Sequence, residues 1–318
     1  SDLGVDLSLF NNRLRMTADY YRKKTTDLLN NVEMPRSSGY TTALRNIGSI
    51  RNSGFELQLD GRIIDRAVKW DLGVNFSLNR SKVLVLSEDK DIFGGELDNT
   101  ILKDQLNLMR VGEPMYVFYG YVEDGYDENG HIVYKNMDDD PAITAADKTI
   151  IGDPNPDFLV NLTTAVSYKG FTLSAFFQSS IGNDIYSLSM AAQAYDYGYN
   201  GNTLREVYYN HWTPENPTAK YPNLDQTSYK MSDRFVYDGS FVRLKNLELA
   251  YDVPCARNKF IKRARVYVSA QNLFTITSYP FWDPDINANG GGSSMIQGVD
   301  SYCYPSARTY TIGCRLTF

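Results

Sequence analysis

The chain has 318 residues, a formal net charge of −6 and a pI near 5.1. This acidic balance disfavours a nucleic-acid partner, which would need a basic surface, and no run of about 18 apolar residues predicts a transmembrane helix. Aromatic residues make up 13 %, including 24 tyrosines, and the length allows one large all-β domain or two ordinary ones. The first residues, SDLGVDLSLF, resemble a strand and not a signal peptide.

Apolar and polar residues alternate at period two along most of the chain. WDLGVNFSL places Trp70 and every second residue after it opposite Asp71 and Asn75, and the last ten residues, TYTIGCRLTF, repeat the pattern. No long run of period 3.6 competes, so we predict an all-β chain. About nine strands are expected, at 3–10, 13–23, 51–62, 67–78, 158–168, 171–180, 240–252, 262–272 and 307–318. A phase slip in FVRLKNLELAY predicts a β-bulge near Lys245–Asn246.

The connections between these strands alternate between short and long. FNNR, DGRIIDRAVK, YKGF and VPCARNKFIK are short or modest, whereas 24–50, 79–157, 181–239 and 273–306 are long. This asymmetry is typical of outer-membrane barrels, with short periplasmic turns and long extracellular loops. It predicts a transmembrane antiparallel β-barrel whose chain ends in the periplasm.

Within this barrel, the apolar side of the last strand would face lipid and take part in barrel assembly, and Arg315 would face the lumen. That apolar side comprises Tyr310, Ile312, Cys314, Leu316 and Phe318. The insertion 79–157 is expected outside the membrane, with a hairpin of its own made by YVFYGYVE, a DGYDENG turn and HIVYKN.

Several motifs then carry a resemblance to a known family. They are GDPNPDF, YKGFTLSAFFQSSIGNDIY, HWTPENP, SFVRLKNLELAYDVP, RVYVSAQNLFTIT and the terminal ARTYTIGCRLTF. In this order they resemble the SusC/RagA-type TonB-dependent transporters of Bacteroidetes, over essentially the whole of 1–318. The resemblance implies a barrel of about 22 strands, a size class that needs a plug. No plug segment is found, so we expect this chain to be the C-terminal part, about nine strands, of a longer polypeptide.

The resemblance also implies a function and partners. Such transporters import oligomeric nutrients, most often oligosaccharides and in some members peptides, across the outer membrane. A SusD-like surface lipoprotein would act as a lid, the TonB–ExbB–ExbD complex would supply energy, and outer-membrane lipid and the rest of the same transporter would surround this chain.

Aromatic loop residues are the candidates for substrate contact, because flat rings beside Asp and Asn suit the stacking and hydrogen bonding of an oligosaccharide. They are Tyr195, Tyr197, Tyr199, Trp212, Tyr221, Phe281 and Trp282. The alternatives are the aromatic girdles that flank any membrane barrel and a surface that binds a partner protein.

The stretch NMDDDPAITAAD has oxygen-bearing side chains at calcium-loop spacing. Asn136, Asp138, Asp140 and Asp147 occupy positions 1, 3, 5 and 12. Position 6 is Pro141 where calcium loops have glycine, and Asp147 is shorter than the usual Glu. We keep two hypotheses, a Ca²⁺ site in an extracellular loop and a solvated acidic loop without metal; no other cofactor is expected.

Signals for catalysis are weak. The two histidines, His131 and His211, lie in different loops, and no GxSxG, HExxH or CxxC pattern occurs, so no catalytic residue is predicted. The three cysteines are expected as free thiols. The main alternative is a soluble carbohydrate-binding β-sandwich, whose apolar faces would meet in a core; an enzyme at the barrel mouth comes third.

Overall fold

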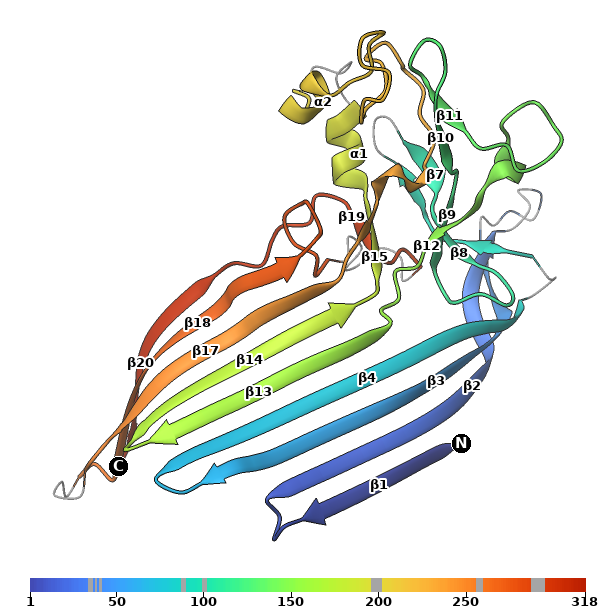
Figure 1. Ribbon diagram of the computed structural model, residues 1–318. Coiled ribbons are helices and arrows are strands. Elements are labelled where there is room, and N and C mark those ends of the chain that lie inside the picture. Colours follow the sequence, from blue (N-terminus) through green and yellow to red (C-terminus); the bar gives the residue numbers. More distant parts are fainter. Residues whose placement is uncertain are drawn as a thin grey trace.

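A computed structural model describes residues 1–33, 37, 39, 42–86, 90–98, 102–195, 202–255, 260–286 and 295–318, with no side-chain detail at 30–33, 42–45 and 47. Within these residues the chain forms one nine-stranded antiparallel sheet, curved like part of a barrel wall, with a smaller region above one end (Figure 1). The strands are β1 (Asp2–Leu9), β2 (Leu14–Glu33), β3 (Thr42–Asp65), β4 (Val68–Leu86), β13 (Phe158–Tyr168), β14 (Phe171–Ile181), β17 (Phe241–Val253), β18 (Arg263–Thr277) and β20 (Thr309–Thr317). All nine predicted strands are present.

The strands lie in the sheet in their order along the chain, and each pairs antiparallel with the next. Strands β1 and β20 are the two edges, and no described strand joins them (Figure 1). The bulge predicted near Lys245–Asn246 is confirmed, because the ladder between β17 and β18 shifts between Leu244 and Asn246.

The expected loop 24–50 is in fact largely strand, and the expected loop 79–157 begins with strand. Strands β2, β3 and β4 run well past the predicted ends, so residues 24–33, 42–50 and 79–86 belong to the sheet. The backbone ladder continues there through shifts in register between Thr25 and Leu28 and between Ser49 and Ile50. A bulge reverses the alternation of faces, so these extensions carry no steady period-two signal in the sequence.

The region above the sheet, here called the head, comprises the described residues of 90–157, 182–240 and 278–308. Its strands are β5 (Ile92–Phe93), β6 (Glu96–Asp98), β7 (Lys103–Gln105), β8 (Asn107–Met109), β9 (Val117–Gly120), β10 (Glu123–Tyr126), β11 (Ile132–Tyr134), β12 (Thr149–Gly152), β15 (Asp184–Ser187), β16 (Val236–Asp238) and β19 (Val299–Asp300). Two short helices accompany them, α1 (Leu188–Tyr195) and α2 (Arg205–Tyr209). The expected hairpin is made by β10 and β11, whereas the residues of β9, predicted to belong to it, pair with β8 and β12.

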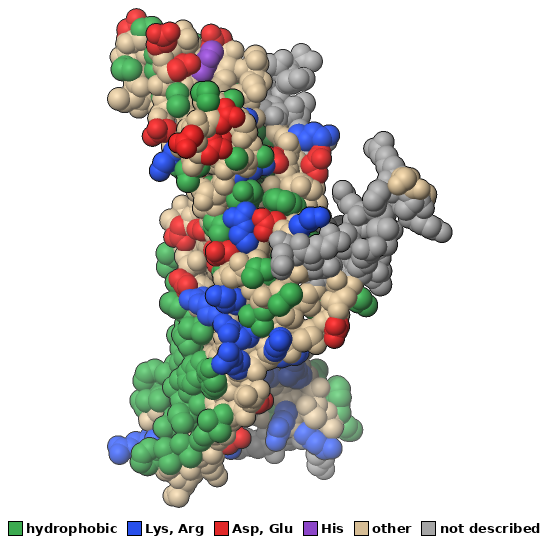
Figure 2. All heavy atoms as spheres, turned by 90° about the vertical axis from the view of Figure 1, so that its right-hand side faces the viewer, with side chains coloured by type: hydrophobic (Ala, Val, Ile, Leu, Met, Phe, Trp, Pro, Cys, Tyr) green, Lys and Arg blue, Asp and Glu red, His purple; other side chains and the backbone are tan. Residues whose placement is uncertain are grey.

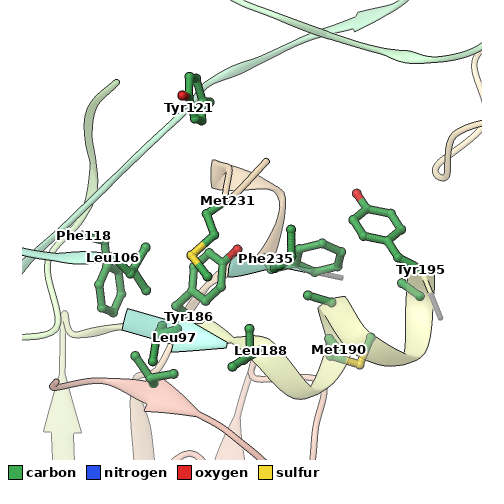
Figure 3. Close-up of a cluster of buried hydrophobic side chains, with 14 of the residues drawn as sticks. Leu97, Leu106, Phe118, Tyr121, Tyr186, Leu188, Met190, Tyr195, Met231 and Phe235 are labelled. Carbon is green, nitrogen blue, oxygen red and sulfur yellow. The ribbon is translucent and has the colours of Figure 1, made fainter. Parts of the chain in front are cut away.

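The larger of two hydrophobic clusters in the described chain lies in the head. Phe118, Tyr186 and Phe235 are at most 2 % exposed, and they pack with Leu106, Met231 and the apolar side of α1 (Figure 3). The three cysteines are free, as predicted. No helix among the described residues is long and apolar enough to cross a membrane.

Candidate functional site

A polar belt crosses one face of the sheet. Cross-strand pairing aligns one polar residue from each of eight adjacent strands in a single row: Asp6, Thr17, Gln58, Asn75, Asn161, Gln178, Arg243 and Thr275. The amides and hydroxyls of this row can donate and accept hydrogen bonds along a path several strands wide.

The neighbouring row is entirely apolar and faces the other way. It consists of Leu7, Met16, Leu59, Val74, Leu162, Phe177, Leu244 and Phe274, each next in sequence to a member of the polar belt. Successive side chains of a strand point to opposite faces. The sheet therefore has one polar and one apolar face, and large apolar side chains on the latter lie exposed, including Leu173 (48 %), Tyr310 (70 %) and Ile312 (87 %).

One member of the polar belt, Arg243, is buried and holds a loop of the head against the sheet. Its Nε donates to Thr275 Oγ1 (2.9 Å), and Nη2 donates to Asp283 Oδ1. Its Nη1 lies 3.4 Å from both Asp285 Oδ2 and Ser306 Oγ. These bonds fix Asp283, Asp285 and Ser306, which belong to the connection between β18 and β20, over the polar face.

The carboxylate of Asp283 is stabilised in its charged form. Burial opposes ionisation, but the backbone N–H groups of Ser306 and Asp285 and the Arg243 guanidinium outweigh burial and lower its pKa below the usual 3.8. A second buried network holds the same loop: Tyr279 Oη donates to Asp300 Oδ2 (2.6 Å) and accepts from the Ser187 hydroxyl (3.0 Å). The loop is thus held at two points.

Three cavities surround Pro284, where this loop meets segment 154–156. Their volumes are about 240, 420 and 330 Å³, and Pro284 lines all three. The buried Oδ1 atoms of Asn161 and Asn272, which line two of them, accept no hydrogen bond from the described residues. Because buried polar atoms are nearly always bonded, these two acceptors suit a solute, or water, that brings hydroxyl or N–H groups. We call this group of cavities the Pro284 site.

The predicted aromatic contacts are scattered. Of the candidates that the structure describes, only Trp282 lines the Pro284 site; it is 58 % exposed, and its ring stacks on Phe281 with centroids 5.0 Å apart. Phe281 is half-buried against the head core, and Trp212 covers the β10–β11 turn, where a Cβ on Gly130 would lie 2.2 Å from its ring.

The two remaining described candidates belong to the core. Tyr195 (4 % exposed) stacks on Tyr229 with ring centroids 3.8 Å apart, and Tyr221 is 2 % exposed. Neither ring offers a face to a solute in this structure, so packing and not ligand contact explains them. Tyr197 and Tyr199 lie outside the described residues.

The acidic loop has its oxygens turned onto its own backbone. Asn136, Asp138 and Asp140 each accept the N–H two residues further on, and Asp147 accepts from Met137 (2.7 Å) and Thr144 (2.7 Å). Among the described residues no group of three or more His, Cys, Asp or Glu side chains is placed to hold a metal ion. Calcium binding here stays a prediction.

Comparison with known proteins identifies the family. A family model described as "TonB dependent receptor-like, beta-barrel" matches residues 1–273. The chain belongs to the TonB-dependent receptor family. The expected fold class, a transmembrane antiparallel β-barrel of which this chain supplies nine strands, is confirmed, and the soluble β-sandwich alternative is wrong.

Relatives of this receptor chain are longer than it. TonB-dependent receptor P3 of Formosa agariphila is 34 % identical over the whole chain, and TonB-dependent receptor SusC of Bacteroides thetaiotaomicron is 29 % identical over 99 % of it. The structure of the RagAB peptide transporter superposes with a TM-score of 0.83 at 28 % identity over the whole chain. The chain spans 34 %, 31 % and 34 % of these proteins, respectively.

The receptor's Pro284 site was missed from sequence except for Trp282, which was a candidate. Asn272 lies in the motif RVYVSAQNLFTIT but was not singled out, and Asn161 lies in none of the quoted motifs. The signal that could have found Asn161 is its place in the polar belt, which becomes visible once the strands are aligned in register.

Proposed function

We propose that this receptor chain lines the import path of an outer-membrane transporter that takes up an oligomeric nutrient, an oligosaccharide first and a peptide as the alternative. The observation that carries the proposal is the polar belt lying back to back with an apolar row across eight strands. A wall that is apolar on one face and hydrogen-bonding on the other separates lipid from a wet lumen.

The Pro284 site supports binding along this path. It combines unbonded amide oxygens of Asn161 and Asn272, the carboxylate of Asp285 and the exposed ring of Trp282. Such a set can hydrogen-bond the hydroxyls of a sugar chain or the N–H groups of a peptide, with the ring as a stacking surface. One structural relative, RagAB, is a peptide transporter, which supports the peptide alternative.

The orientation follows from the connections. We place the short turns after β1, β3, β13 and β17 in the periplasm, together with Phe318, and the head outside the cell. In this arrangement the head would meet a SusD-like lipoprotein, and TonB would act from the periplasm on a plug carried by the rest of the transporter.

Uptake and binding by the full-length transporter test the proposal. Replacing Asn161 and Gln178 with leucine removes hydrogen-bonding groups of the belt, and two lost bonds should weaken solute binding about tenfold or more. The matched control replaces their neighbours Leu162 and Phe177 with isoleucine and leucine on the apolar face. Labelled oligosaccharides and peptides would be offered to cells and to purified protein, with and without a functional TonB.

We expect TonB-dependent uptake of one solute class, weakened in the belt variant and kept in the control. Protein that fractionates outside the outer membrane, or belt and control variants that bind and import alike, would overturn the proposal.

A further inference from the structure

A cluster of cations lies on the apolar face of the sheet at the end nearest the head. Arg22, Ser53 and Arg80 form one cross-strand row on β2, β3 and β4, and Lys24, Arg51 and Lys82 form the next. We call the five cations the outer basic patch. Six adjoining outward positions thus hold five cations, one serine and no carboxylate.

The face that carries the patch follows from strand geometry. The row just before it is Tyr20, Phe55 and Leu78, where Tyr20 is 50 % and Phe55 38 % exposed. The patch residues are two and four positions further along the same strands, so they share the face of these apolar residues. Figure 2 shows Lys and Arg side chains gathered directly above a continuous hydrophobic surface.

The apolar band below the patch has the height of a bilayer core. On β4 the outward apolar residues run from Val68 to Leu78. Ten residues rise about 34 Å along a strand, or about 26 Å across the membrane at a tilt of about 40°. The outer basic patch therefore begins at the edge of the hydrocarbon layer, about 7 Å along the strands beyond the last apolar row.

Among the described residues, most of the patch has no counter-charge. Arg80 pairs with Asp157 (2.5 Å), but Arg22, Lys24, Arg51 and Lys82 form no ion pair with any described residue. Neighbouring strands are about 4.8 Å apart, so these four cations crowd an area roughly 10 Å wide. Like charges at this spacing repel unless an anion lies among them.

The patch is also local. On β14 and β18, the outward side chains near the same end of the sheet are Ile181 and Ile276, which are apolar. If the cations were part of a ring around the whole barrel, cations would also lie at this level on β14 and β18. The clustering indicates a particular ligand on this side.

We propose that the outer basic patch binds the phosphate groups of a phosphorylated glycolipid in the outer leaflet of the outer membrane. The proposal rests on the orientation of the barrel given under the proposed function. Acyl chains would lie on the apolar band while phosphates reach the cations above it. Arginine binds phosphate through two parallel N–H groups and lysine as a point charge, so Arg22 and Arg51 would provide geometry and Lys24 and Lys82 additional charge.

The test removes the four unpaired cations from the full-length transporter. In the variant R22T/K24T/R51T/K82T, threonine keeps the strand propensity of these positions. Delipidated protein in detergent would be offered phosphorylated lipid A, dephosphorylated lipid A or inorganic phosphate. Lipid retained per protein would be measured by native mass spectrometry and affinity by titration.

Two control variants test whether the charges of the patch and their position, and not the stability of the protein, account for a loss of lipid binding. R22K/K24R/R51K/K82R keeps all four charges. K23T/R66T/K135T/R205T removes four cations elsewhere, including Lys23, which lies between patch residues on β2 but on the opposite face. We expect these two to bind phosphorylated lipid A within twofold of wild type, and the patch variant to lose at least about tenfold, since each cation near an anionic surface contributes appreciably.

Dephosphorylated lipid A and inorganic phosphate should bind poorly to all forms. Equal retention by the patch variant and wild type, or equal binding of the dephosphorylated lipid, would overturn the proposal. Loss of an acidic partner protein from the patch variant, with lipid retention unchanged, would assign the patch to that partner. If the patch variant takes up solute normally and also binds lipid as wild type does, only the lipid site is overturned. If wild-type protein is found outside the outer membrane, both proposals are overturned.

Discussion

The sheet and the head place the same kinds of large apolar side chain in opposite surroundings. In the sheet, large apolar side chains point away from the protein: Ile312 is 87 % and Leu3 68 % exposed. In the head, Phe118 and Tyr186 are fully buried. The difference shows that the sheet is built for contact with lipid and the head for contact with water.

The two regions also use polar groups differently. The sheet lines up polar side chains in open rows on one face, and the head encloses them with partners, as Asn107 does by donating to the carbonyls of Tyr116 (2.8 Å) and Gln297 (3.0 Å). Arg243 belongs to both regions because it lies in the polar belt and holds a loop of the head. Substitutions in the head, in the sheet and at Arg243 can test this difference between the two regions.

The largest effect is expected in the head core. Phe118→Ala should leave a cavity and cost about 3–5 kcal/mol, releasing the head while the sheet stays folded. Ile312→Ala truncates an exposed side chain and should leave the free energy of unfolding in detergent almost unchanged. Hydrogen exchange of the full-length protein checks both, and similar effects of the two changes would contradict the contrast between the regions.

A cost of similar size, about 3–5 kcal/mol, is expected for Arg243→Met, because Asp283 would stay buried without its guanidinium. Amides of residues 279–286 should exchange faster while the barrel strands keep their protection. The matched control is Arg265→Met: its partners Glu248 and Asp252 lie 3.3 Å away at the surface, so its loss should cost at most about 1 kcal/mol. If both variants exchange alike, Arg243 does not hold the loop.

The two faces of the sheet can be compared at adjacent positions. Leu162→Arg places a charge near the middle of the lipid-facing band and should cost about 2–4 kcal/mol. Asn161→Arg, one residue earlier, faces the polar side and should leave assembly intact. Abundance in the outer membrane and the mobility of unboiled protein on a gel measure this. Equal assembly of both variants would be inconsistent with the assigned faces.

The smallest effect concerns the acidic loop of the head. The N–H groups of Met137 and Thr144 lower the pKa of Asp147 below its usual 3.8. An acid with a lowered folded-state pKa stabilises the fold above about pH 4, and this stabilisation disappears as pH falls through the folded-state value. Asp147→Asn at neutral pH should therefore speed proteolysis within 136–147 and remove the pH dependence of that cleavage near pH 4. Cleavage that is unchanged by both pH and the substitution would show that Asp147 does not hold the loop.

Alternation at period two is a property of neighbouring residues, so the nine strands, the two faces and the bulge near Lys245–Asn246 could be predicted from the sequence. It also separated lipid-facing residues such as Ile312 and Leu316 from polar ones such as Arg315. Aromatic content alone did not distinguish Trp282, which is exposed beside Pro284, from Tyr195 and Tyr221, which are buried.

Features that join residues far apart in the chain became apparent only in the folded protein. The polar belt, the Arg243–Asp283 contact and the outer basic patch each join strands or loops separated by tens of residues, and the extent of β2, β3 and β4 was set by their mutual ladder. The physical reason is that strand pairing fixes which side chains become neighbours, and a single-residue shift in register would place each of them on the other face.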